Sequence, residues 1–165
     1  MNRNTVTAAV IIGIVAIVAI VLVADRRGEA ASAGAPAALT GTTIDGATFD
    51  LATYRGKPAV INFFASWCPP CNEEAPDLVA FAKAHPEAGF VGVDTGDKLA
   101  DGQAFVKKYG IPYPVVFDGD GSLSAPFGFQ YIPTTVFLDK DGVEKDRITG
   151  AADTQRFEQG LQAAQ

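Results

Sequence analysis

Hydrophobic positions follow two different patterns along the chain. Val6 to Ala24 is an apolar run without a charged side chain. As a helix, these nineteen residues would span roughly 28 Å, close to the thickness of a bilayer's hydrocarbon core. We therefore expect a transmembrane anchor at 6–24, preceded by a short cytoplasmic tail at 1–5. From Leu39 onward, short apolar runs alternate with amphipathic stretches, which is typical of a folded domain.

The segment between these two parts, residues 25–38, is rich in alanine and glycine and has no apolar period. This composition predicts a flexible linker. The apolar run before it is longer than the usual signal-peptide core of about 7–15 residues, which favours a retained anchor. Cleavage is the alternative, because Ala31-Ser32-Ala33 has the pattern of a signal-peptidase site. Flanking charges barely discriminate the orientation of the anchor.

The part at 39–165 alternates predicted strands with predicted helices. An Asp-Gly pair within Thr42–Phe49 predicts a hairpin, and the apolar run Pro58–Ala65 predicts a strand buried on both faces. A second Asp-Gly pair within Thr134–Thr149 predicts a late antiparallel hairpin. The other expected elements are, in order, helix Pro69–Ala84, strand Phe90–Val93, helix Leu99–Tyr109, strand Val115–Phe117, helical turn Leu123–Phe127 and helix Thr154–Ala164. Strands separated by helices imply a parallel core, so the expected fold class is α/β.

Composition and charge narrow the classes of function. Without anchor and linker, roughly 128 of the 165 residues are left, which is enough for one domain with its own core. The net charge of −6 and the isoelectric point near 4.6 argue against nucleic acid as a partner, because phosphate binding needs a concentrated basic surface. An apolar fraction of 48% excludes collagen-like and disordered chains.

The candidate chemistry lies in the only two cysteines, Cys68 and Cys71, which follow the most apolar predicted strand and open the first long helix. Cys68 falls at the N-cap, where the helix dipole and free amides stabilise a thiolate. Pro69 suits the first helical position, since its missing amide would be unpaired there. Cys71 lies one turn deeper and is the expected resolving thiol. This arrangement predicts dithiol–disulfide exchange.

Three other uses of the cysteines are less favoured. A structural disulfide between positions i and i+3 would constrain the unfolded chain little. A zinc site needs four ligands, and the lone His85 is the only other soft donor. A peroxidatic cysteine would have a Thr or Ser three residues earlier and a Pro seven residues earlier, and neither cysteine has them. We expect no metal and no organic cofactor.

The motif Trp67-Cys68-Pro69-Pro70-Cys71 and the downstream segment Tyr131-Ile132-Pro133-Thr134-Thr135 together resemble the thioredoxin superfamily. More narrowly, the chain resembles the membrane-anchored TlpA/ResA/DsbE-type thiol–disulfide oxidoreductases of bacteria, over Leu39 to Gln165. The resemblance implies a thioredoxin-like fold: a mixed central sheet flanked by helices, with an N-terminal β-hairpin and an inserted strand–helix unit within 90–129. It also implies that Pro133 is a cis-proline packed against the disulfide.

Glu74 is the further candidate for catalysis. Thioredoxin has a buried Asp where this chain has Asn62, whereas ResA-like proteins resemble this chain there and place a Glu three residues after the second cysteine. Helical spacing also puts Glu74 on the same face as Cys71, so we expect it to transfer a proton. Glu73 is expected nearer to solvent. The alternative is that both glutamates only complement the helix dipole.

Substrate binding is assigned to residues around the motif. Trp67 is expected to shape the rim of the site rather than to react. Tyr131, Ile132 and Phe129 are candidates for an apolar groove that docks an extended substrate segment. For Phe129, a position in the hydrophobic core is an equally weighted alternative to the docking groove.

The resemblance implies a function as well as a fold. We expect a single-pass protein of the cell membrane whose C-terminal domain is extracytoplasmic and exchanges its cysteine pair with the thiols and disulfides of proteins. Apocytochrome c is the expected substrate, and a membrane-embedded redox partner would recycle the pair. Two alternatives are a general oxidant of secreted proteins and a non-enzymatic tethered binding module.

Overall fold

The computed structural model describes residues 37–165. The predicted tail at 1–5, the predicted anchor at 6–24 and residues 25–36 of the predicted linker lie outside the described residues. Ala37 is already part of the fold, because its N–H donates a 2.8 Å hydrogen bond to the carbonyl of Gly142. Within 37–165, none of the helices has the length and apolarity needed to cross a membrane.

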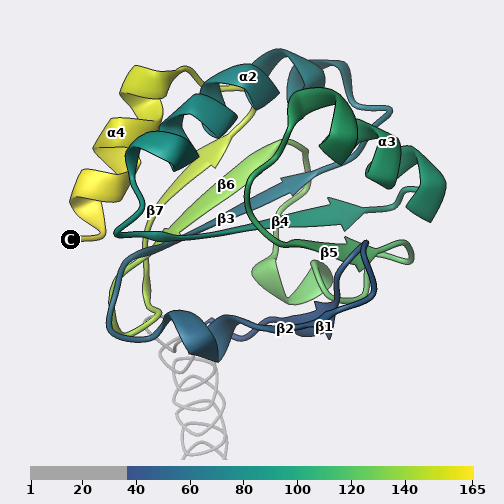
Figure 1. The fold of residues 1–165 in the computed structure, drawn as a ribbon. Coiled ribbons are helices and arrows are strands. Elements are labelled where there is room, and N and C mark those ends of the chain that lie inside the picture. The colour runs from purple at the N-terminus through teal and green to yellow at the C-terminus, as the bar shows by residue number, and fades with distance from the viewer. Residues whose placement is uncertain (1–36) are drawn as a thin grey trace, which may run out of the picture. The chain divides into compact units, whose positions relative to one another are not determined.

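A five-stranded mixed sheet forms the centre of the domain, in the order β5-β4-β3-β6-β7 (Figure 1). Strands β3 (Ala59–Phe64), β4 (Gly89–Thr95) and β5 (Val115–Asp118) run parallel. Strands β6 (Thr134–Leu138) and β7 (Glu144–Thr149) add the antiparallel edge. Every residue of the central strand β3 is buried, as its continuous apolar run predicts. The predicted parallel core with an antiparallel hairpin is confirmed.

The two faces of the sheet have different covers. Helices α2 (Pro69–Ala84), α3 (Leu99–Tyr109) and α4 (Thr154–Ala163) lie on one face (Figure 1). The other face carries the hairpin of β1 (Thr40–Thr42) and β2 (Thr48–Asp50), with the short 3-10 helices η1 (Leu51–Tyr54) and η2 (Ala125–Phe127). The predicted hairpin and the inserted unit, α3 with β5, are confirmed. The sheet is not flanked by α-helices on both faces, because the hairpin takes one of them.

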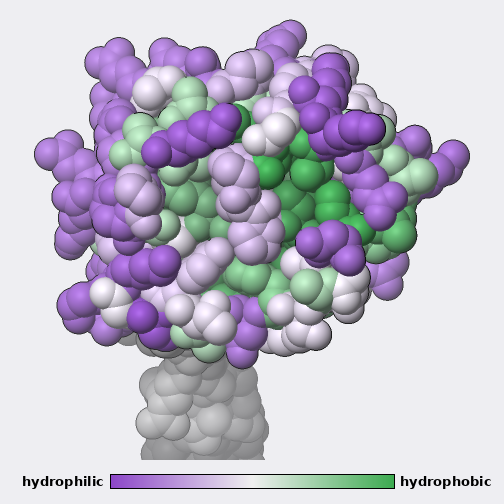
Figure 2. All heavy atoms as spheres, viewed as in Figure 1, coloured by the Kyte–Doolittle hydropathy of each residue, from purple (hydrophilic) through white to green (hydrophobic). Residues whose placement is uncertain are grey.

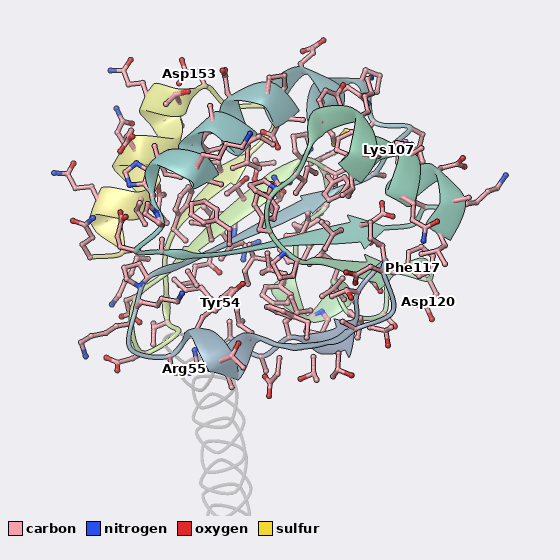
Figure 3. The ribbon with its side chains drawn as sticks, in the orientation of Figure 1. Tyr54, Arg55, Lys107, Phe117, Asp120 and Asp153 are labelled. Carbon is pink, nitrogen blue, oxygen red and sulfur yellow. A yellow bond between two sulfur atoms is a disulfide. The ribbon has the colours of Figure 1, made fainter. Side chains whose placement is uncertain are left out.

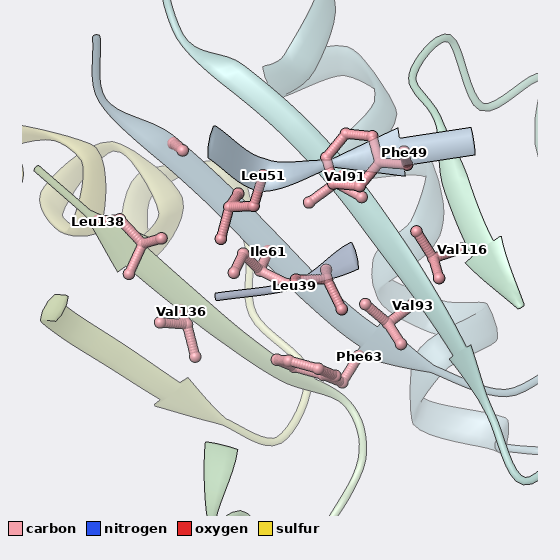
Figure 4. Close-up of a cluster of buried hydrophobic side chains, with 11 residues drawn as sticks. Leu39, Phe49, Leu51, Ile61, Phe63, Val91, Val93, Val116, Val136 and Leu138 are labelled. Carbon is pink, nitrogen blue, oxygen red and sulfur yellow. The ribbon is translucent and has the colours of Figure 1, made fainter. Parts of the chain in front are cut away.

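Side chains of successive strand residues point to opposite faces of the sheet, so each face has its own layer of buried side chains. Ile61 and Phe63 of β3 point toward the hairpin and join a cluster with residues of all the inner strands (Figure 4). Val60 and Phe64 point the other way, toward the helices. Each fully buried side chain of this size contributes about 1.5–3 kcal/mol. Tyr54 fixes η1 beneath the sheet, where its hydroxyl donates a 2.9 Å hydrogen bond to the carbonyl of Phe90 (Figure 3).

Candidate active site

The cysteine pair lies where β3 ends and α2 begins. Cys68 is the N-cap of α2, as predicted, and its backbone is extended, with φ −86° and ψ 111°. Its Sγ accepts a 3.2 Å hydrogen bond from the N–H of Cys71. Pro69 and Pro70 have no N–H, so Cys71 supplies the first free amide of the helix. Cys68 and Cys71 are joined by a disulfide, with their Cα atoms 5.3 Å apart.

In this oxidised form both cysteines are buried, Cys68 with 3% and Cys71 with 1% of its surface exposed. The difference between the two sulfur atoms therefore comes from the N-cap position and not from exposure. Two large aromatic residues near the pair in sequence or space are open to solvent: Trp67 is 63% exposed and Tyr131 is 68% exposed. They are the surface that an approaching protein would meet beside the disulfide.

The segment 131–133 reaches the cysteine pair from the other side of the sheet. The carbonyl oxygen of Ile132 lies 3.6 Å from the Sγ of Cys68. The Ile132–Pro133 peptide bond is cis, as the family resemblance implies, and Pro133 is buried. Phe129 instead packs on Phe63, with ring centroids 4.5 Å apart, so it is a partly buried side chain at the border of the core. Of the predicted docking residues, the structure thus places Tyr131 and Ile132 at the site.

Glu74 is buried on the next turn of α2 after Cys71. Its carboxylate accepts hydrogen bonds from the side-chain amide of Asn62 (2.8 Å) and from the N–H of Ala152 (3.2 Å). Burial raises the pKa of Glu74 to about 7, although these two hydrogen bonds oppose the rise. Glu74 can therefore both hold and release a proton near neutral pH. Glu73 is exposed, as predicted.

Asn62 connects this carboxylate to the sheet. Its amide nitrogen also donates a 3.0 Å hydrogen bond to the Oγ1 of Thr135 on the adjacent strand β6. Hydrogen bonds thus link the Glu74 side chain of α2 to two inner strands of the sheet, to β3 directly and to β6 through Asn62. This arrangement keeps the carboxylate on the side of the helix that carries Cys71.

Asn72 is a residue of the site that the sequence analysis missed. Its side-chain amide donates to the carbonyls of Ser66 (2.9 Å) and Cys68 (3.0 Å). Its Oδ1 accepts from the Nζ of Lys108 (3.1 Å) and the hydroxyl of Tyr109 (2.8 Å), both on α3. Asn72 therefore ties the loop before the helix to α3. The sequence did contain a signal for this role: an amide side chain directly after Cys71 is close to the carbonyls that precede the helix and can donate to them.

The loop between β4 and α3 also contacts the segment before Cys68. The N–H of Ser66 donates to Oδ2 of Asp97 at 2.6 Å. The indole Nε1 of Trp67 donates to the carbonyl of Gly96 at 3.0 Å. Trp67 thus lies at the rim, where the sequence placed it, with its ring held by the neighbouring loop.

His85, the other soft donor considered for zinc, is far from the cysteines. It caps the C-terminal end of α2, the end opposite Cys71, and its ring nitrogens pair with Glu87 (2.8 Å) and Glu158 (2.9 Å). Across the described range 37–165, histidine, cysteine and acidic residues do not form a group of three or more that could hold a metal.

A surface hollow of about 540 Å³ opens between the hairpin and α3. It is lined by the β1–β2 hairpin, by α3 and by the segment before β5, including Ile44, Val106 and Ile111. Figure 2 shows apolar side chains gathered on the face of the domain over these elements. The lining includes neither the cysteines nor Trp67 nor Tyr131, although its Ile44 and Val115 belong to the same buried cluster as Cys68 and Cys71.

Several known proteins are similar to this chain in sequence or in structure. The sequence pattern of the Redoxin family matches residues 20–163. The soluble secreted antigen MPT53 of Mycobacterium tuberculosis is 43% identical over 103 residues, which are 62% of this chain and 60% of the relative. The thiol-disulfide oxidoreductase ResA of Geobacillus thermodenitrificans is 29% identical over 122 residues, or 73% of this chain and 70% of ResA.

Among solved structures, a secreted M. tuberculosis disulfide oxidoreductase homologous to E. coli DsbE is 36% identical, with a TM-score of 0.70. The match covers 75% of this chain and 94% of that structure. This chain spans only 60% of the length of MPT53, whereas the family pattern extends over nearly all of the described domain. The chain belongs to the Redoxin family.

Proposed function

We propose that this protein is a thiol–disulfide oxidoreductase that uses Cys68 and Cys71. The observation that carries the proposal is the Cys68 sulfur at the N-cap of α2, which accepts the N–H of Cys71. In the reduced protein the same amide and the helix dipole would stabilise a Cys68 thiolate. The relatives named as disulfide oxidoreductases support the same activity.

The reaction proceeds in two exchange steps. The Cys68 thiolate attacks one sulfur of a substrate disulfide, so that a mixed disulfide forms and the other substrate sulfur leaves as a thiolate. Cys71 then loses its proton and attacks the Cys68 sulfur. This second step releases the remaining substrate thiol and leaves the Cys68–Cys71 disulfide, so two electrons have passed to the substrate. The reverse sequence oxidises a dithiol.

Glu74 accepts the Cys71 proton in this scheme, directly or through one water. Burial raises a thiol's pKa, and Cys71 is buried, so its ionisation needs a base. The Glu74 carboxyl is on the next turn of the same helix, and its pKa of about 7 suits a base near neutral pH. The flanking Trp67, Tyr131 and Ile132 would bind the substrate segment next to the disulfide.

Location is a further part of the proposal. We place the domain outside the cytoplasm, attached to the cell membrane by residues 6–24, because that run is uncharged and a disulfide pair suits an oxidising compartment. MPT53 is named a soluble secreted antigen, and a solved relative is named a secreted disulfide oxidoreductase; these names support export, whereas the proposed attachment rests on residues 6–24. Protease added to intact spheroplasts should digest the domain, and the domain should fractionate with membranes. Protection from protease would contradict this location.

The proposed substrate is apocytochrome c, reduced by the dithiol, with a membrane-embedded partner that restores the dithiol. This substrate is the one that the resemblance to ResA/DsbE-type oxidoreductases implies, and a ResA and a DsbE homologue are among the similar proteins. A second candidate is a general oxidant of secreted proteins, favoured by the N-cap, since stabilising the Cys68 thiolate stabilises the reduced form and makes the disulfide more oxidising. Equilibration with glutathione separates the two. A reductant should have a potential near about −270 mV, and an oxidant one near about −120 mV.

The activity itself is tested with insulin and dithiothreitol. The protein should accelerate reduction of the insulin disulfides, while Cys68→Ser should abolish the acceleration and serve as the matched control. A binding module with an inert disulfide, the remaining alternative, would give no acceleration over dithiothreitol alone.

A further inference from the structure

A buried acid outside the scheme above lies close to the active-site loop. Asp94 is in β4 and has 0% of its surface exposed. Within the described residues, neither of its carboxylate oxygens accepts a hydrogen bond from an N–H group or a hydroxyl, so its contact with Asp97 is one between two acids. Asp118 on the neighbouring strand β5 is also buried, but donors stabilise its carboxylate. It accepts hydrogen bonds from the N–H groups of Leu123 and Ser124 and from the hydroxyl of Thr95.

The groups that face Asp94 make a charge there unfavourable. On the neighbouring strands, the register partners of Asp94 are two apolar residues, Phe64 of β3 and Phe117 of β5. From α3, Gly102 closes over the carboxyl so tightly that a β-carbon at position 102 would collide with Oδ2. The charged groups acting on Asp94 are both acids, Asp97 of the following loop and Asp101 of α3.

These surroundings keep Asp94 protonated. Burial raises its pKa to about 8, and the charge of Asp97, a hydrogen bond to Asp97 and the charge of Asp101 add to the rise. At neutral pH the carboxyl is therefore a hydrogen-bond donor, and the side chain of Asp97 is its acceptor.

Asp97 holds the complementary charge. Burial tends to raise its pKa, but bonds from Ser66, Lys98 and Asp94 bring the pKa below the ordinary value. Oδ2 accepts the Ser66 N–H at 2.6 Å, and Oδ1 accepts the Lys98 N–H at 2.7 Å. The shared proton thus lies on Asp94, and the charge on Asp97 is turned toward the segment that leads into Cys68.

We infer that Asp94 is a positioning residue for the redox site: in its neutral form it fixes the Asp97 carboxylate that holds the Ser66 amide, and its ionisation loosens the segment leading into Cys68. An ionised Asp94 would repel the adjacent Asp97 carboxylate, because no donor in the described part of the chain compensates a negative charge on Asp94. Asp97 would then turn away, and the Ser66 and Trp67 contacts with the β4–α3 loop would weaken. The effect on exchange rests on the proposed function, but the structural coupling does not.

Trp67 provides a direct reporter of this coupling. It is the only tryptophan in the chain, and its indole bonds to Gly96 in the loop that carries Asp97. In the oxidised full chain neither cysteine can titrate, so a change of Trp67 fluorescence between about pH 6 and 9.5 reports another group. We expect one transition with its midpoint near pH 8. Asp94→Asn should lose it, because the amide still donates to Asp97 but cannot ionise. Glu74→Gln, the matched control, should keep it.

A second measurement uses the wild-type chain alone. In a pH titration followed by NMR, the carboxyl carbon of Asp94 and the amide of Ser66 should shift with one common midpoint. Separate midpoints, an Asp94 already charged at neutral pH, or a fluorescence transition that survives Asp94→Asn would overturn the inference.

In the reduced chain, the exchange rate with glutathione disulfide, divided by the Cys68 thiolate fraction, should fall between pH 7 and 9 in wild type and stay level in Asp94→Asn. Coupling without any exchange would refute the proposed function only; exchange without coupling would refute this inference only.

Discussion

The side-chain amide of Asn62 donates a 2.8 Å hydrogen bond to the carboxylate of Glu74, which joins the strand before the cysteine motif to the helix that follows it. The amide of Asn62 cannot titrate in the neutral range, whereas the buried carboxyl of Glu74 can. The only member of this pair that can move a proton is therefore the one on the helix that carries Cys71. This relationship leads to two predictions about Glu74.

The first prediction is kinetic. Glu74→Gln keeps the shape of the side chain but removes the base, so resolution of the mixed disulfide should slow by roughly 10²-fold, at the low end for general-base catalysis. In wild type the resolution rate should rise with pH through about pH 7, where Glu74 loses its proton, and this inflection should be absent from the variant. Stopped-flow measurement of the second exchange step gives both quantities.

Glu73→Gln is the control for this experiment, because Glu73 is in the same helical turn and exposed. It should leave the rate and the pH profile almost unchanged. Equal effects of the two variants, or none from Glu74→Gln, would reduce Glu74 to a residue that complements the helix dipole.

The second prediction concerns stability. Native Glu74 keeps its proton up to about pH 7, whereas in the unfolded chain it loses the proton near its ordinary value of 4.5. The native state thus binds more protons in this window, and stability from this group is full below pH 4.5 and is lost as pH rises through 7. The loss amounts to roughly 3 kcal/mol.

Urea unfolding of the oxidised protein at pH 5 and pH 8 checks this. Gln has one acceptor oxygen, so Glu74→Gln should lose the bond from Ala152 at every pH. It should therefore be less stable than wild type at pH 5, with the gap closing toward pH 8. A gap that is the same at both pH values would show that Glu74 is ionised throughout.

The third prediction concerns the two thiols. In the reduced protein Cys68 has the N-cap position and accepts the Cys71 amide, so it should be the thiolate near neutral pH. Iodoacetamide at pH 7 should label Cys68 at least about tenfold faster than Cys71, measured by mass spectrometry of the peptides. Equal rates would remove the distinction between attacking and resolving thiol.

The fourth prediction concerns Asn72. Asn72→Ala removes the donor to the Ser66 and Cys68 carbonyls and the acceptor for Tyr109, and it should lower the free energy of unfolding by about 1–3 kcal/mol. Glu73→Ala, at the exposed next position, should change it by less than about 0.5 kcal/mol. Similar values for both variants would mean that Asn72 does not hold the loop.

Much of the fold follows from local sequence patterns. The continuous apolar run at 58–65 predicts the fully buried strand β3, and the Asp-Gly pairs locate both hairpins. The patterns do not tell which face of the sheet each helix covers. That depends on how the hairpin packs under Ile61 and Phe63, a contact between segments distant in sequence.

The site was predictable in the same uneven way. A helix start and two cysteines suffice to place Cys68 at the N-cap, and helical spacing suffices to place Glu74 on the buried face of α2 that also carries Cys71. Asp94 and Asp97 were not predictable, because their role depends on the parallel pairing of β3 with β4, which brings Asp97 next to Ser66. The sequence around residue 94 does not show that its carboxyl group faces other carboxyl groups and, within residues 37–165, no hydrogen-bond donor.

In the proposed reaction, Cys68 forms a mixed disulfide with a protein substrate and Cys71 resolves it. The most direct test uses the reduced full chain of Cys71→Ser, which can attack but cannot resolve, incubated with disulfide-bonded apocytochrome c and analysed by non-reducing mass spectrometry. A covalent adduct at Cys68 should accumulate, Cys68→Ser should form none at Cys71, and wild type should release reduced substrate. An adduct absent from Cys71→Ser, with this substrate and with insulin alike, would contradict the account.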